Sequence, residues 1–270
     1  MKTSEQTFSS RTPEAGSGKL LGNKAKPKLR RIKKHSLADA QLRHLRRGAC
    51  GGLAICLIAA ASALASAQNR PAAFVDAAAV VPGLVAEMRY AGTHNFVGRR
   101  IDGYAAANCL LTRPAADALA EVARDLAPRG LVIKVFDCYR PARAVANFVR
   151  WAHDLNDTAG KAEFYPNVDK RTVFHDGYIS SRSGHSRGST LDLTLARTGD
   201  GELDMGTPFD FFSPLSSPAA IGVSAEAKAN RALLATAMRR RGFRPYIKEW
   251  WHFTLGAEPF PNTYFDFLVQ

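Results

Sequence analysis

The chain has 270 residues, of which 46% are hydrophobic and 23% charged, so it resembles an ordinary globular protein with enough residues for one good core. Its formal net charge of +13 would suggest a nucleic acid or an anionic membrane as partner. Residues 1–67, however, carry 13 Lys and Arg against 3 Asp and Glu, whereas the remainder carries 24 against 21. Because the excess belongs to the N-terminal segment, the rest of the chain does not have the charge of a nucleic-acid-binding protein.

The N-terminal segment has the organisation of a secretory signal. Residues 1–47 are rich in Lys, Arg, Ser and Gly and predict a disordered basic n-region. Residues 48–67 then form an uncharged apolar stretch that ends in small residues at a signal peptidase site. We therefore expect a periplasmic or secreted protein that begins near residue 68. The alternative is an uncleaved inner-membrane anchor, with the domain of residues 68–270 on the same, outer side.

The remainder of the chain alternates irregularly between short strands and helices. In chain order, the apolar patterns predict a strand-like segment over 80–90, a helix over 112–126, a buried strand over 131–137, a helix over 142–155, a half-buried strand over 191–195 and a helix over 226–241. This order predicts a single α+β domain, in which helices flank a central antiparallel or mixed sheet.

Two of the four cysteines remain once the signal is removed. Cys50 and Cys56 lie in the apolar stretch, whereas Cys109 and Cys138 lie in the domain. An even number of cysteines in an oxidising compartment makes a disulfide between them plausible. Each also lies in an apolar block, so two reduced thiols in the core are the alternative.

Two short segments combine a histidine with a carboxylate. His185 lies on a turn rich in Ser and Gly, and Asp192 follows it on the alternating strand. Near the C-terminus, Glu249 precedes His252 by three residues, so that one of the two could bind a metal while the other handles a proton. Zinc accepts imidazole nitrogen and carboxylate oxygen, and a catalytic zinc has three protein ligands and one open position for water. The joint pattern favours a metal site.

The motif Ser183-x-His185-x-x-Gly188-x-x-x-Asp192, together with Glu249-Trp250-Trp251-His252, resembles the zinc D-alanyl-D-alanine dipeptidases, the family that includes the dipeptidase of vancomycin resistance. The resemblance extends over about residues 75–270. Further blocks follow in the order of the family, at residues 95–98, 101–104, 137–141, 206–211 and 259–267.

The resemblance implies a complete catalytic metal site on the sheet. His185, Asp192 and His252 would bind one Zn²⁺ per chain, with a water molecule in the fourth position. Glu249 would take a proton from that water and later deliver it to the leaving amine. Arg140 would stabilise the oxyanion of the tetrahedral intermediate, with Asp137 as the carboxylate that braces it.

The substrate implied by the resemblance is the small dipeptide D-Ala-D-Ala, hydrolysed to two D-alanines in cell-wall peptide turnover. A dipeptide has a charge at each end, so its pocket should offer a counter-charge to each. Asp210 would bind the amine, Ser183 and Tyr90 would supply hydrogen bonds, and Arg140 would also attract the carboxylate.

Two other functions fit parts of the pattern. One is a related zinc carboxypeptidase that trims peptidoglycan stem peptides, although such an enzyme needs a groove that is open at the amine end, where Asp210 would lie. The other is a non-catalytic cell-wall-binding module with a structural zinc. The presence of both Glu249 and Arg140 argues against the latter.

Overall fold

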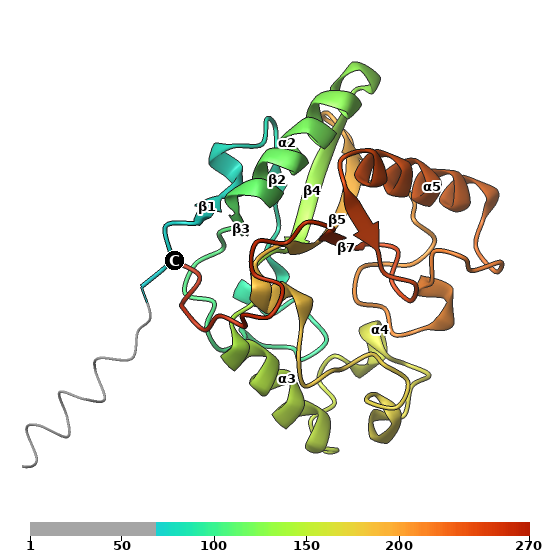
Figure 1. Ribbon diagram of the computed structural model, residues 1–270. Helices are drawn as coiled ribbons and strands as arrows, with labels where there is room; N and C mark the ends of the chain where they lie inside the picture. Colours follow the sequence, from blue (N-terminus) through green and yellow to red (C-terminus); the bar gives the residue numbers. More distant parts are fainter. Residues whose placement is uncertain (1–68) are drawn as a thin grey trace, which may run out of the picture. The chain divides into compact units, whose positions relative to one another are not determined.

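The computed structural model describes residues 69–270 (Figure 1). The n-region, the apolar stretch and the cleavage site predicted for residues 1–67 therefore lie outside the described residues. Within residues 69–270, no helix has the length and apolar character needed to cross a membrane.

A mixed five-stranded sheet with the order β2–β4–β5–β7–β6 forms the centre of the domain. Strand β2 runs parallel to β4, and the other neighbours are antiparallel. A second, two-stranded antiparallel sheet joins β1 and β3. The strands are β1 (Phe74–Asp76), β2 (Val85–Ala86), β3 (Leu110–Thr112), β4 (Leu131–Asp137), β5 (Thr190–Arg197), β6 (Phe243–Pro245) and β7 (His252–Leu255).

The α-helices are α2 (Arg113–Leu126), α3 (Ala142–His153), α4 (Lys161–Phe164) and α5 (Ala225–Arg240). Helix α2 contacts α5 and β4, and α5 contacts β6. In Figure 1, α2 and α5 lie together in the upper part of the domain, whereas α3 and α4 lie in the lower part. Helices therefore flank a mixed sheet, which confirms the predicted α+β domain.

Two predicted elements have different bounds. The strand expected over 80–90 is reduced to β2, because Arg89–Ala91 forms a 3₁₀ turn that buries Tyr90 among aromatic rings. The second predicted helix ends at His153, because the backbone of Asp154 is extended.

Alternation along β5 divides its side chains between a core and a polar face. Leu191, Leu193 and Leu195 are fully buried, and successive strand residues point to opposite faces. Asp192 and Thr194 therefore project from the other face of the sheet. The pattern that buries the leucines thus also places Asp192 where it can take part in a site.

The structure pairs Cys109, which precedes β3, with Cys138, which follows β4, in a disulfide with a Cα–Cα distance of 5.2 Å. Both residues are buried, and the bridge joins the small sheet to the central one.

Removal of this disulfide should destabilise the protein. Because the bridge closes a loop between residues 29 apart, the double variant Cys109→Ala/Cys138→Ala should lose about 3–4 kcal/mol of unfolding free energy. Urea denaturation measures the loss, and dithiothreitol should shift the wild-type transition in the same direction while leaving the variant unchanged. An unchanged midpoint in the variant would contradict the expected contribution.

Candidate active site

The register of β5 and β7 places two of the predicted metal ligands side by side. Asp192 pairs directly with His252 across the antiparallel strands, and residues paired in this way project from the same face. The Nδ1 atom of His252 lies 3.0 Å from Oδ1 of Asp192. The Nε2 atom of His185 lies 3.3 Å from Oδ2 of Asp192 and 3.3 Å from Nδ1 of His252. The three residues therefore present one ligand atom each to a common point.

His185 belongs to a short 3₁₀ turn, Gly184–Arg187, that enters β5. The hydroxyl of Ser183 accepts a hydrogen bond from the His185 backbone N–H and caps the turn. The turn ends at Gly188, whose φ of +81° lies in the left-handed region. A Cβ at this position would also lie 2.1 Å from the ring of Phe74. Glycine is thus required both for the backbone conformation and for the close approach of β1.

The donor set fits a zinc ion. His185 Nδ1 lies 2.8 Å from the carbonyl oxygen of Cys138, which can only accept, so Nδ1 carries the proton. The lone pair of Nε2 therefore faces Asp192 and His252, as in metal-binding histidines held by a backbone carbonyl. Oδ1 of Asp192 is buried without a hydrogen bond of good geometry, although His252 lies nearby. One cation at this point would satisfy all three ligand atoms.

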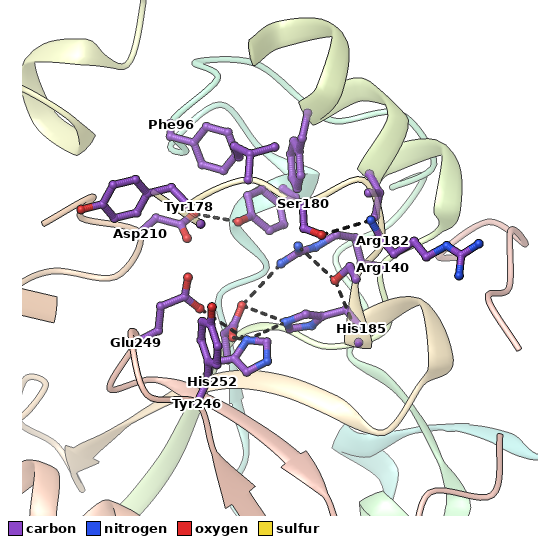
Figure 2. A pocket seen from close by; sticks show the side chains of 18 of the residues that line it. Phe96, Arg140, Tyr178, Ser180, Arg182, His185, Asp210, Tyr246, Glu249 and His252 are labelled. Carbon is purple, nitrogen blue, oxygen red and sulfur yellow. Dashed lines mark hydrogen bonds and ion pairs between the residues drawn. The ribbon is translucent and has the colours of Figure 1, made fainter. Parts of the chain in front are cut away.

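Glu249 lies beside the cluster and faces the same cavity (Figure 2). One of its carboxylate oxygens lies 3.5 Å from Nδ1 of His252. Burial raises the pKa of the Glu249 carboxyl to about 7, although the neighbouring His252 opposes this shift. A carboxylate of this kind can both take and return a proton near neutral pH.

Arg140 is held rigidly on the other side of the cluster. Its Nε donates to Asp137 at 2.8 Å, and its guanidinium lies over the ring of Tyr90 at 5.0 Å. Asp137 is fully buried and also accepts a hydrogen bond from the hydroxyl of Tyr104 at 2.6 Å. One Arg140 nitrogen lies 3.5 Å from the Asp192 carboxylate. The guanidinium is therefore fixed next to the predicted metal position.

Asp210 provides a second carboxylate across the cavity. Its backbone φ of +59° is uncommon for a residue other than glycine, and such conformations concentrate at functional sites. The Tyr90 hydroxyl donates to Asp210 at 2.7 Å. Burial, followed by the negative charge of Asp192, raises the pKa of Asp210 well above its usual range. Tyr90 thus orients Asp210 in the structure.

All eight predicted metal, catalytic and substrate-binding residues line one cavity of about 290 Å³. Sequence reasoning missed Tyr246, whose ring packs 5.5 Å from that of His252, and Tyr178, which lies at the Asp210 side of the cavity in Figure 2. It also missed the contact of Tyr104 with Asp137, although Tyr104 lies in one of the blocks that resemble the family. No local pattern distinguishes these tyrosines from core residues.

The chain is similar to known dipeptidases over most of its length. Residues 70–270 match the peptidase M15 family, D-ala-D-ala dipeptidase. The D-alanyl-D-alanine dipeptidase of Enterococcus faecium is 41% identical over 192 residues, which cover 71% of this chain and 95% of that protein. The Streptomyces coelicolor dipeptidase is 42% identical over 198 residues, covering 73% and 97%. The Escherichia coli dipeptidase is 34% identical over 181 residues, covering 67% and 83%.

A solved structure of a vancomycin resistance D,D-pentapeptidase in complex with Zn(II) aligns with 57% of this chain and 77% of that one, at 14% identity and a TM-score of 0.29. The family match and the sequence relatives define the class of the protein as a zinc metallopeptidase. Within this class, the chain belongs to the D-alanyl-D-alanine dipeptidase family, as the sequence motifs predicted.

The metal site predicts zinc binding that depends on each ligand. The purified protein should contain one zinc per chain, and His252→Ala should reduce the bound zinc to a small fraction because only two ligands would remain. Elemental analysis after dialysis measures both. His94→Ala, which changes an exposed histidine that does not line the cavity, should retain one zinc. Equal zinc contents in the two variants would contradict the assigned ligands.

Proposed function

We propose that this protein hydrolyses D-Ala-D-Ala to two D-alanines as a zinc-dependent dipeptidase. The observation that carries the proposal is the enclosure of the His/Asp/His cluster, Glu249 and Asp210 in one cavity of about 290 Å³. Such a cavity lies at or below the lower end of the size range of small-molecule sites, in keeping with a dipeptide. The catalytic groups and the counter-charge for the substrate amine thus share one small space.

The three predicted metal ligands and Glu249 have separate roles in the proposed reaction. When bound by His185, Asp192 and His252, zinc supplies a Lewis acid and lowers the pKa of a coordinated water. Glu249 is positioned to accept the proton released during attack on the peptide carbonyl, and to return it to the leaving amine. Because burial already raises its pKa to about 7, both transfers are accessible near neutral pH.

Arg140 is the donor for the oxyanion that develops on the peptide oxygen. Its guanidinium is fixed before substrate arrives, because Asp137 accepts from Nε and the Tyr90 ring packs against it. Preorganised donors of this kind stabilise a transition state without reorganisation during the reaction. The remaining N–H groups of Arg140 lie toward Ser183 and Asp192.

Asp210 selects substrates whose free amine lies at its end of the cavity. A cationic amine placed beside Asp210 would favour the charged carboxylate and offset its unfavourable burial. At the wall formed by Asp210 and Tyr90, the cationic amine of a dipeptide would pair with the Asp210 carboxylate. A longer stem peptide has an uncharged amide at that position and could not form this ion pair. This wall favours the dipeptidase over the stem-trimming carboxypeptidase.

The test is D-alanine release from D-Ala-D-Ala by the purified zinc-loaded protein. Glu249→Gln should lower kcat by about 100-fold or more while zinc content stays the same, because a general base is lost. Glu163→Gln, in an exposed carboxylate on α4, should keep full activity. The substrate N-acetyl-D-Ala-D-Ala, which has no cationic amine, should be cleaved poorly. Efficient cleavage of the acetylated peptide alone would instead support the carboxypeptidase.

We also propose that the enzyme acts outside the cytoplasm, where it recycles D-Ala-D-Ala released from the cell wall. Support comes from the signal-like residues 48–67 and from the disulfide between Cys109 and Cys138, since disulfides persist mainly in oxidising compartments. An exported enzyme cannot reach a cytoplasmic pool of the dipeptide, so turnover of released wall peptides suits it better than glycopeptide resistance.

Cell fractionation tests this location. The protein should occur in the periplasmic or culture fraction as a chain shortened to begin near residue 68, which N-terminal sequencing of the purified protein would establish. An uncleaved chain in the membrane fraction would support the anchor instead. Full-length protein confined to the cytosol would contradict export.

A further inference from the structure

A second cavity, of about 320 Å³, adjoins the catalytic one. The two cavities share Val145, Arg182 and Ser183 as lining residues. Its other walls come from the start of α3, the turn before β5 and the C-terminal segment, with the lining residues Ala142, Ser181, Ser186, Asn262 and Tyr264. Nothing in the catalytic mechanism uses this space.

The lining of the second cavity is suited to an anion. It contains no acidic side chain, and its one charged residue is Arg182. Ser186 is only 1% exposed, and its hydroxyl has no hydrogen-bond partner. A buried hydroxyl without a partner is costly unless a ligand or water satisfies it. The hydroxyls of Ser181 and Ser183 and the amide of Asn262 add further potential donors.

Arg182 differs from Arg140 in its surroundings. Arg140 already has carboxylate neighbours in Asp137 and Asp192, whereas the described residues 69–270 contain no carboxylate paired with Arg182. The Arg182 guanidinium instead lies over the ring of Tyr264 at 5.5 Å, which orients it on the side of the second cavity. Arg182 is therefore an exposed cation beside the Tyr264 ring, with its hydrogen-bonding groups available.

The direction of the substrate brings its leaving residue to this cavity. Figure 2 shows Asp210 and Arg182 on opposite sides of Arg140. A dipeptide with its amine at Asp210 and its scissile carbonyl near Arg140 would extend its C-terminal residue toward Ser183, which lines both cavities. This orientation rests on the proposed dipeptidase function.

We infer that the second cavity is a subsite for an anionic side chain on the C-terminal residue of the substrate, bound by Arg182 and Ser186. The enzyme would thus accept D-alanyl dipeptides whose second residue carries a carboxylate, in addition to D-Ala-D-Ala. The reaction is the same hydrolysis, and the leaving product is an acidic D-amino acid.

The test compares D-Ala-D-Glu with D-Ala-D-Gln, which are nearly equal in shape and differ in charge. The wild-type enzyme should favour D-Ala-D-Glu in kcat/KM by roughly three- to fivefold, as an exposed ion pair permits. In Arg182→Gln the ratio of the two kcat/KM values should fall to about one. Ser186→Ala should raise KM for D-Ala-D-Glu relative to D-Ala-D-Ala. Arg197→Gln, at the opposite end of β5 from Asp192, is the control and should keep the wild-type ratio.

The ratio of the two kcat/KM values distinguishes loss of the subsite from a general loss of activity, because a general loss lowers both values equally and leaves the ratio unchanged. Addition of 0.5 M NaCl should reduce the wild-type preference, since salt screens exposed charges. Hydrolysis of D-Ala-D-Ala together with a ratio near one in the wild type would overturn the subsite and leave the dipeptidase intact. Failure to hydrolyse D-Ala-D-Ala would overturn the dipeptidase and the subsite together.

Discussion

Four buried or half-buried carboxylates surround the catalytic cavity, and the compensation of their charge is the constraint on which the site depends. Asp192, Asp210 and Glu249 line this cavity together with Arg140, and Asp137 pairs with Arg140 from behind it. Burial raises the pKa of Asp137, Asp210 and Glu249, so each of these groups resists ionisation in isolation. A zinc dication at the predicted site and the amine of the proposed substrate would supply further positive charge. The site is therefore built to gain stability when it is loaded.

The Asp137 carboxylate couples the parts of this site to one another. Its Oδ1 accepts from Tyr104, and its Oδ2, which accepts from Arg140, lies 3.4 Å from Nδ1 of the predicted metal ligand His185. These partners come from a loop, from the end of β4 and from the turn before β5. One buried carboxylate thus relates the position of the predicted oxyanion donor to that of a predicted zinc ligand. Rigid outer contacts of this kind orient the groups that perform the chemistry.

Features that depend on neighbouring residues could be predicted from the sequence, whereas contacts between distant residues could not. Asp192 was predictable because alternation along its strand is a short-range pattern, and Arg140 because it lies in a block that resembles the family. The register that pairs Asp192 with His252 is a long-range property: the spacing of Glu249 and His252 indicated a ligand in that segment, and the family resemblance assigned it to His252. Tyr104 reaches Asp137 across 33 residues, and no local signal marks such contacts. The second cavity is assembled from residues 142–264 and was not predicted for the same reason.

The disulfide also has a consequence for metal binding. The carbonyl oxygen that accepts from His185 Nδ1 belongs to Cys138, a residue whose position is constrained by its bond to Cys109. Oxidation of the cysteines and coordination by His185 therefore favour the same local arrangement. By thermodynamic reciprocity, if disulfide formation strengthens metal binding at His185, metal binding stabilises the disulfide by the same free energy. The redox state of the Cys109–Cys138 pair and the occupancy of the predicted zinc site would thus be linked equilibria in this fold.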